Sequence, residues 1–212
     1  PWLVEADPHA GTLLAIAEVC GNLAAVGARI DSLADCLCFG NPEKPEVMGQ
    51  FRATCEALGE GALALGVPYI SGNVSFYNET SQGAVPPTPV LMGIGLVDDI
   101  RNCVTSDLKL DGELWIIGAT RDERGTSLAA RHLEFEGGTL PTVDFTTLVP
   151  RMEALIEAIA AGEVVACHDL SAGGLAVALA EMCLSGNGAT IELSSKLDAM
   201  ATLFSEPAGR WL

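Results

Sequence analysis

The stretch YISGNVSFYNET, Tyr69 to Thr80, decides how this chain is expected to fold and where its polar chemistry should lie. Its first residues are typical of a buried strand, whereas Gly72, Asn73 and Ser75 bring polar or flexible positions into the same run. A strand that serves only packing gains nothing from such side chains, because a buried polar group without a partner costs free energy. We therefore expect a strand end that holds a ligand.

Helical and strand-like segments alternate on both sides of this stretch. Apolar residues recur at helical spacing in three segments, 12–24, 47–65 and 148–159, with Thr12 and Thr147 as expected caps of the first and third. Ser171 and a Gly-Gly pair are expected to open a fourth helix. Short apolar runs predict buried strands at 30–37, 90–97, 113–119 and 163–169, and the stretch from Tyr69 begins like another. This order predicts an α/β protein with α+β mixed sheets and flanking helices, in two blocks that meet near residues 120–145.

Composition and charge exclude several classes of protein. Hydrophobic residues make up 49% of the 212 residues, which predicts a packed core and not a disordered chain. The formal net charge is −17, from 28 acidic and 11 basic residues. A surface this negative repels a phosphate backbone, so nucleic-acid binding is not expected.

The cysteines favour a reducing compartment. Seven cysteines are scattered through apolar runs, as is typical of free thiols in a cytoplasmic protein. The one close pair, Cys36 and Cys38, has no Cys or His pair downstream to complete a zinc site. No apolar run reaches the roughly 18 residues of a membrane span, and the first residues lack the pattern of a signal peptide, so we expect neither.

Two loops follow strand-like segments and carry oxygen ligands. They are ADCLCFGNPEKPE (34–46) and SGNVSFYNE (71–79), and if the strands are neighbours their polar side chains meet at one end of the unit: Asp35, Glu43, Glu46, Asn73, Asn78 and Glu79. Mg²⁺ takes one or two such oxygens from protein and the rest from water and phosphate. Gly72 would let backbone approach a ligand, and Ser75 should share a face with Asn73. The alternative is that these residues only form ordinary turns.

A third candidate is ACHDLSAGGLA, residues 166–176. His168 and Asp169 stand before two glycines at a helix start, where exposed N–H groups can bind an anion. The alternative is a helix cap with tight packing, and no partner at a readable distance makes His168 a base. The segment lacks the order of a P-loop or a dinucleotide fingerprint.

Five ordered motifs carry a resemblance to a known family. DCLCFGNPEKPEVMGQF, PYISGNVSFYNET, GIGLVDDI, HDLSAGGLAVALAE and LFSEPAGR closely resemble the synthetase subunit of phosphoribosylformylglycinamidine synthases, over nearly the whole chain. The resemblance implies an aminoimidazole ribonucleotide synthetase-like fold in which two α/β units are fused. Residues 1–105 would be the later part of the second sheet-forming, barrel-contributing domain, and residues 106–212 the beginning of the second flanking domain.

The resemblance also implies an activity and site residues. In the family, ATP with Mg²⁺ phosphorylates the amide oxygen of formylglycinamide ribonucleotide, and ammonia made from glutamine by a glutaminase subunit or domain displaces the phosphate. By match to the motifs, Asp35 and Gly72 would bind ATP, Asn73 would be a Mg²⁺ ligand, and Ser75 would bind the substrate.

The chain departs from the family pattern in two places and lacks much of it. Cys38 stands where Asn is frequent, and Ala172 stands where an acidic residue is common. The family's catalytic histidines and most carboxylate ligands lie in an N-terminal half that this chain does not contain, so no catalytic residue is assigned here. We expect the chain alone to be inactive.

Two other functions stay open. The chain could be a non-catalytic, structural or nucleotide-holding half of that enzyme. It could also belong to a sister enzyme such as aminoimidazole ribonucleotide synthetase, although the pairing of NPEKPEVMGQF with SGNVSFYNE argues against this.

Overall fold

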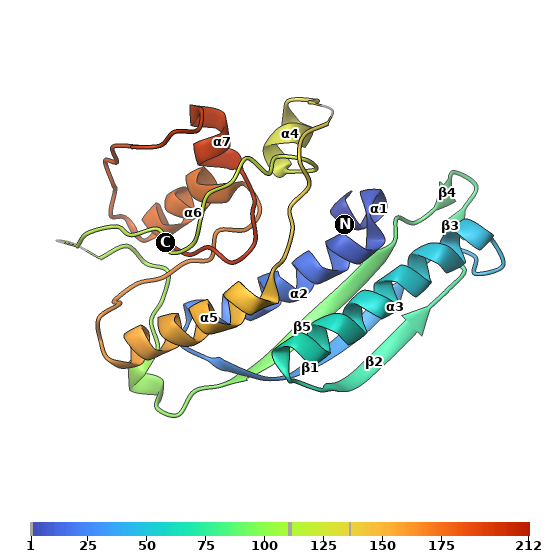
Figure 1. Cartoon of the computed structure of the whole chain (residues 1–212), viewed down its shortest axis with the longest axis horizontal. Helices are drawn as coiled ribbons and strands as arrows, with labels where there is room; N and C mark the ends of the chain where they lie inside the picture. Colours follow the sequence, from blue (N-terminus) through green and yellow to red (C-terminus); the bar gives the residue numbers. More distant parts are fainter. Residues whose placement is uncertain (1, 110–111, 136) are drawn as a thin grey trace.

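A three-stranded sheet forms the first half of the protein. The computed structural model describes residues 2–109, 112–135 and 137–212. Strand β1 (Arg29–Cys38) is central, with β2 (Tyr69–Ser75) parallel on one side and β5 (Thr88–Leu96) antiparallel on the other (Figure 1). A short hairpin, β3 (Glu79–Thr80) and β4 (Gly83–Ala84), lies beyond the end of β2. The predicted mixed sheet is therefore confirmed.

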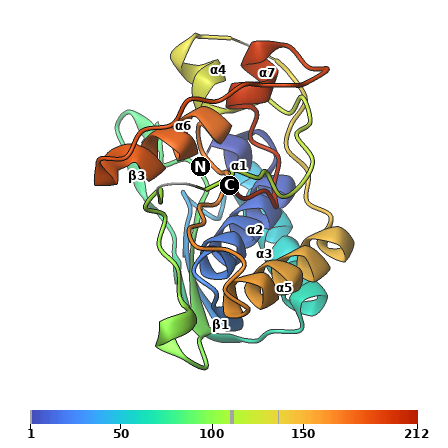
Figure 2. The same cartoon turned by 90° about the vertical axis from the view of Figure 1, so that its left-hand side faces the viewer.

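Three helices lie on the same side of this sheet: α2 (Pro8–Ala25), α3 (Pro45–Leu65) and α5 (Phe145–Ala160) (Figure 2). Strand β5 meets α2 closely, because a Cβ at Gly93 or Gly95 would lie 3.0 Å or less from the side chain of Leu23. The core between the helices and β1 includes Ile16, Cys20, Leu37, Phe39 and Ala57. Burying this apolar surface is the main stabilising contribution to the unit.

The other face of the sheet is bare and apolar. Side chains alternate along a strand, so residues that do not face the helices point the opposite way. On β5 these are large and exposed: Val90, Met92, Ile94 and Leu96.

The second half is built from shorter elements. Helices α4 (Leu128–His132), α6 (Gly174–Met182) and α7 (Ala199–Phe204) lie together above α2 and α5 in the view of Figure 1, and the short α1 (Trp2–Ala6) precedes α2. Two 3-10 turns, Ile100–Asn102 and Cys183–Ser185, complete the described elements. No described helix has both the length and the apolar character to cross a membrane.

Several local predictions were wrong. Residues 113–119 and 163–169 form no strand and make only single bridges, Ile117 and Asp169 both to Trp211. Their apolar residues lack neighbouring strands that would complete a ladder.

Two caps also differ from the sequence prediction. The side chain of Asp7 caps α2 and that of Asp144 caps α5, in place of Thr12 and Thr147. Thr12 instead lies fully buried, and its hydroxyl donates to the carbonyl of Pro8. Asp7 and Asp144 directly precede the two helices, and aspartate is at least as good an N-cap as threonine. Thr12 and Thr147 lie inside the helices and therefore do not take the N-cap position.

Trp211 joins the two halves. Its side chain is fully buried, and its indole Nε1 donates to the carbonyl of Gly21 in α2 at 3.0 Å. Backbone bonds link Trp211 to Ile117 in both directions. The C-terminal segment is thereby attached to α2, in the first half of the protein.

We predict that Trp211→Phe lowers the free energy of unfolding by about 1–3 kcal/mol, because it removes a buried hydrogen bond and leaves a small void. Trp115→Phe is the matched control, since Trp115 is 71% exposed, and it should change stability by less than about 0.5 kcal/mol. Urea unfolding followed by circular dichroism measures both. Equal losses in the two variants would contradict the joining role of Trp211.

Candidate functional site

The parallel pairing of β1 and β2 brings the two polar loops to one end of the sheet. Asp35 pairs in register with Gly72, and Cys36 with Asn73. A Cβ built on Gly72 would lie 2.9 Å from Oδ2 of Asp35 and 3.2 Å from Oδ1. The carboxylate of Asp35 therefore lies over a position that only glycine leaves open.

Asp35 lies on the helix-covered side of the sheet, without a partner. Burial raises the pKa of its carboxyl. Burial and then the charge of Asp35 also raise the pKa of the Cys55 thiol, which belongs to α3, and that of the Tyr69 hydroxyl. Among the described residues Asp35 accepts no side-chain hydrogen bond and forms no ion pair. An unpaired, partly desolvated carboxylate is characteristic of a functional site.

Asn73 and Ser75 lie on the opposite, bare face. The side-chain amide of Asn73 contacts Sγ of Cys36 at 3.4 Å, and Ser75 pairs in register with Cys38. The prediction that Asn73 and Ser75 share a face is confirmed. Asp35 lies on the other face of the sheet, because a strand places neighbouring positions on opposite faces.

Two of the predicted oxygen ligands fasten the loops instead. The side-chain amide of Asn78 donates to the carbonyls of Phe39 and Ser75, each at 2.9 Å. Glu79 accepts from Lys44 at 2.8 Å and from the backbone of Asn41 at 2.9 Å, and the Lys44 hydrogen bond lowers the pKa of its carboxyl. These contacts hold 39–44 against 75–79.

The other two carboxylates of this set make no such contact. The backbone N–H of Glu43 donates to Oδ1 of Asn41 within a turn, and Glu46 lies in the first turn of α3. Both are exposed.

The glycines of the third candidate segment bind an anion of the chain itself. The backbone N–H of Gly173 donates to Oε1 of Glu206 at 2.7 Å, and that of Leu128 does so at 2.8 Å. A Cβ at Gly174 would lie 2.6 Å from the carbonyl of Ser205. In the structure, residues 166–176 form a tightly packed helix start, which was the alternative to an anion site.

His168 is held by carboxylates. Its Nδ1 lies 3.3 Å from Oδ1 of Asp169, and its Nε2 lies 3.3 Å from Oε2 of Glu181. The hydrogen bond to Asp169 is the main reason that the pKa of His168 is raised. Desolvation opposes ionisation of Asp169, but hydrogen bonds from His168 and Ser171 outweigh it and lower the pKa.

Sequence reasoning missed a polar cluster between the two halves. With its amide oriented to donate, Asn22 lies 2.8 and 3.1 Å from the carboxylate of Asp169. Glu18 stands one turn earlier on α2; although it contacts solvent, desolvation and then the charge of Asp169 raise the pKa of its carboxyl. The available signal was the i, i+4 spacing of Glu18 and Asn22 on one helix face. Among the residues described, no group of three or more His, Cys, Asp or Glu is arranged to hold a metal ion.

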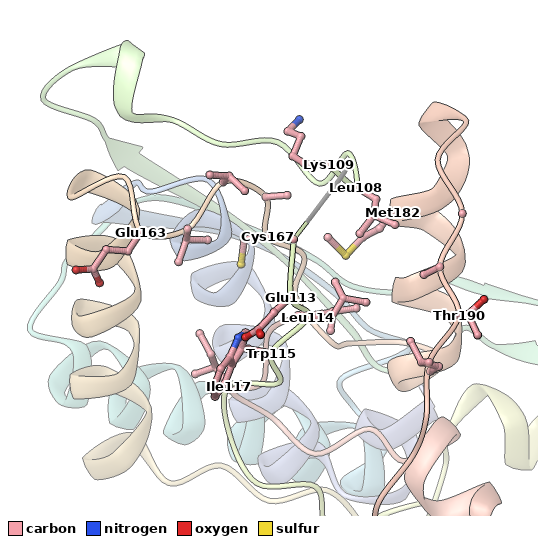
Figure 3. A pocket seen from close by; sticks show the side chains of 18 of the residues that line it. Leu108, Lys109, Glu113, Leu114, Trp115, Ile117, Glu163, Cys167, Met182 and Thr190 are labelled. Carbon is pink, nitrogen blue, oxygen red and sulfur yellow. The ribbon is translucent and has the colours of Figure 1, made fainter.

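A cavity lies elsewhere in the described part of the chain. It has a volume of about 570 Å³ and is bounded by segments 112–117, 163–167 and 188–192 (Figure 3). Its walls are mainly apolar, with Lys109, Glu113 and Glu163 among its few charged side chains. None of the predicted site residues lines it, so its size carries no argument about the chemistry of the β1–β2 end.

We predict that Asp35→Asn raises the free energy of unfolding at about pH 7 by roughly 0.5 kcal/mol, a value that allows for solvent screening. Because the folded-state pKa of Asp35 is raised, its favourable contribution exists below the unfolded pKa and is lost as pH rises. The gain should therefore vanish below about pH 4. Asp31→Asn, an exposed change on the same strand, is the control for urea unfolding at both pH values. A clear loss of stability in Asp35→Asn at neutral pH would refute the assignment.

We predict a pH-dependent effect of His168→Gln. The raised pKa of His168 gives stability that is complete below about pH 6.5 and fades as pH rises through the folded value. The lowered pKa of Asp169 gives stability above about pH 4 that is lost on acidification. The variant should therefore lose most stability, about 1 kcal/mol, between these values.

Thermal unfolding across the pH range measures this difference, with the exposed His132→Gln as control. A loss in His168→Gln that does not change with pH would show that the histidine acts by packing alone.

Two family models match the chain, one to each half. The model of the AIR synthase related protein, N-terminal domain, matches residues 2–97. The model of the AIR synthase related protein, C-terminal domain, matches residues 111–212.

Curated relatives match the whole chain. It is 46% identical over 210 residues to phosphoribosylformylglycinamidine synthase subunit PurL of Frankia casuarinae, covering 96% of this chain and 27% of the relative. It is 43% identical over 219 residues to the subunit of the same name from Rhodospirillum rubrum, covering 100% and 30%. The resemblance carried by the five motifs is confirmed, and the chain spans less than a third of the length of these relatives.

Solved structures share the fold. Thermotoga maritima PurL complexed with FGAR superposes with a TM-score of 0.72 at 20% identity, over 98% of this chain and 35% of that one. Hydrogenase maturation protein HypE in complex with ATP gives a TM-score of 0.60 at 14% identity, over 94% and 61%. Since the two family models together account for nearly the whole chain and the relatives are similar along all of it, the chain belongs to the AIR synthase related family.

Proposed function

We propose that this chain is part of an ATP-dependent ligase of purine biosynthesis. The enzyme would convert formylglycinamide ribonucleotide, ATP and glutamine-derived ammonia into formylglycinamidine ribonucleotide through an iminophosphate. The names of the PurL relatives support this, as do structures of Thermotoga maritima PurL with ATP and with FGAR. A structure of a Thermotoga maritima PurLQS assembly supports a glutaminase partner as the ammonia source.

The observation that carries the proposal is the unpaired carboxylate of Asp35 over Gly72. In this proposal both residues contact ATP, Asn73 binds Mg²⁺ and Ser75 binds the ribonucleotide. Because Asp35 lies on one face of the sheet and Asn73 on the other, the ligands must pass around the outer edge of β2. Strand β2 is at the sheet's edge, and Gly72 and Asn73 are both exposed there.

Asn73 can supply only one of the oxygen ligands that a Mg²⁺ ion needs. Asn73 offers one amide oxygen when its side chain turns from Cys36, and the described residues contain no cluster of three acidic, His or Cys ligands. Mg²⁺ commonly keeps waters and takes the remaining oxygens from phosphates. The bound ion would neutralise phosphate charge, while Asn73 would position it and Ser75 would orient the ribonucleotide through its hydroxyl.

The bare face of the sheet supports the proposed domain roles. Residues 1–105 would form a sheet domain whose exposed apolar side chains on β5 pack against another sheet of the same enzyme in a barrel, because such a surface is unstable in water. Residues 106–212 would begin the flanking domain. The catalytic histidines would come from the preceding part of the longer enzyme.

A non-catalytic, nucleotide-holding role is the second candidate. The unpaired carboxylate of Asp35 over Gly72 is compatible with this role too, because holding a nucleotide needs the same two residues as turning it over. In that case Asp35 and Gly72 would hold ATP without phosphoryl transfer.

Kinetics of the full-length synthase carrying this segment separate the two roles. If the site turns over, Asp35→Asn should raise the KM for ATP about tenfold, because a buried polar contact is lost, and Ser75→Ala should raise the KM for the ribonucleotide by a similar factor. Asn73→Ala should lower kcat and shift the Mg²⁺ dependence upward. Asp31→Asn is the control.

Unchanged turnover in all three site variants, combined with weaker ATP binding in Asp35→Asn, would support the nucleotide-holding role. Unchanged turnover and unchanged ATP binding would overturn both.

A further inference from the structure

The side chain of Asn78 fixes the direction of the Ser75 hydroxyl at the end of β2. Its amide nitrogen donates to the carbonyl of Phe39 and to the carbonyl of Ser75, each at 2.9 Å. The orientation of this amide is therefore determined, because the reverse assignment would place its oxygen against two carbonyl oxygens. Oδ1 of Asn78 then lies 3.2 Å from Oγ of Ser75.

The hydroxyl of Ser75 has a single hydrogen to donate. An amide oxygen can only accept, so this hydrogen is donated to Oδ1 of Asn78. Oγ of Ser75 keeps its lone pairs for any further partner. A ligand that meets Ser75 while this bond is in place must therefore offer an O–H or an N–H group.

Asn78 is attached to the packed core of the first half. Phe39, whose carbonyl Asn78 holds, is fully buried, and its ring packs edge-on against that of Phe51 with centroids 5.4 Å apart. Phe76, the residue after Ser75, packs against the other side chain of this pair, Phe51, at 4.9 Å. A side chain that orients a ligand group needs such rigid support.

A strained residue stands directly before Asn78. Tyr77 has a φ of 60°, in the left-handed region that residues other than glycine rarely adopt. Its N–H donates to the carbonyl of Gly40 at 2.9 Å, and the N–H of Asn78 donates to that of Phe39 at 3.2 Å. Strained residues persist where the surrounding contacts fix them, and they are frequent at ligand sites.

Ser75 lies in the last row of the sheet. It pairs with Cys38, which pairs in turn with Thr88 at the start of β5. The exposed apolar side chains of β5 begin two positions further on, at Val90. The Ser75 hydroxyl is therefore beyond the end of the apolar surface that we assign to the barrel contact.

We propose that Asn78 is a positioning residue that makes the Ser75 hydroxyl a hydrogen-bond acceptor. Ser75 then recognises an O–H or N–H of the ribonucleotide, in its ribose or amide groups, and not its phosphate. A phosphate dianion has no hydrogen to donate and would face the lone pairs of Oγ. The inference rests on the proposed substrate role of Ser75.

Urea unfolding of the chain tests the hydrogen bond by a double-mutant cycle of Ser75→Ala and Asn78→Ala. Either single change removes the bond between Oγ and Oδ1, so the double change cannot remove it twice. The increase in the unfolding equilibrium constant of the double variant should be about threefold or more below the product of the two single increases. Effects that simply multiply would overturn the proposal, whatever the function of the chain.

Kinetics of the full-length synthase carrying this segment test the positioning role. Asn78→Ala should raise the KM for the ribonucleotide about fivefold with little change in kcat, and should add less than about twofold where Ser75 is already alanine. Glu79→Gln is the matched control, because Glu79 fastens the same two segments through Lys44 without contacting Ser75, and it should leave this KM unchanged. An equal increase in both backgrounds, or the same increase in Glu79→Gln, would show that Asn78 only supports the loop and would overturn the proposal.

The pH dependence of the Ser75→Ala effect identifies the group that Ser75 meets. Ribose hydroxyls and amide N–H groups do not titrate near neutrality, whereas a phosphate monoester loses its second proton at about pH 6. The factor by which Ser75→Ala raises the KM for the ribonucleotide should therefore agree within about twofold at about pH 5.5 and about pH 8. A factor that changes steeply across this range would identify a phosphate contact and refute the acceptor role.

Failure of the proposed function gives a different result. An unchanged KM in Ser75→Ala, together with a non-additive unfolding cycle, would remove the substrate role of Ser75 and the inference with it, while the hydrogen bond to Asn78 would stand. The unfolding cycle needs no activity. If Asn78→Ala does not fold, the pH comparison still uses Ser75→Ala alone.

Discussion

The in-register pairing of β1 with β2 is the constraint on which the rest of the structure depends. A single-residue slip would turn every side chain of β2 to the other face, and Asp35 would then meet Asn73 in place of Gly72. The native register gives Asp35 the open space above a glycine and sends Asn73 to the far face. Helix α3 connects the two strands, as a parallel pair requires, and its packing against α2 closes the core above the carboxylate.

The same register places the carboxylate of Asp35 where it lowers the stability of the fold. Asp35 is desolvated by its surroundings and receives no cation from the described residues, so the fold alone does not account for a carboxylate there. By contrast, Glu79 is paired with Lys44 and fastens two loops. Proteins keep a destabilising polar group where a ligand supplies the missing partner, and this is the physical argument for a nucleotide at the β1–β2 end.

Much of the fold followed from periodicity, and the failures have physical causes. Helices α2, α3 and α5 and strands β1 and β5 carry strong apolar patterns and were predictable, whereas β2 was expected only from its first residues. Residues 113–119 and 163–169 have apolar runs, but a strand exists only with a partner, and sequence does not show whether one is at hand. The Glu18–Asn22–Asp169 cluster joins segments almost 150 residues apart, which no local pattern reveals. The candidate site residues were proposed from motifs, whereas their separation onto two faces became apparent only from the register.

Binding of a non-hydrolysable ATP analogue to Gly72→Ala in the full-length enzyme tests the central claim most directly. The added methyl group would meet the carboxylate of Asp35, whereas Gly59→Ala on α3 adds the same group with nothing within 4 Å. The account predicts that Gly72→Ala weakens the affinity about tenfold or more while Gly59→Ala leaves it unchanged. Equal affinities in the two variants would contradict it.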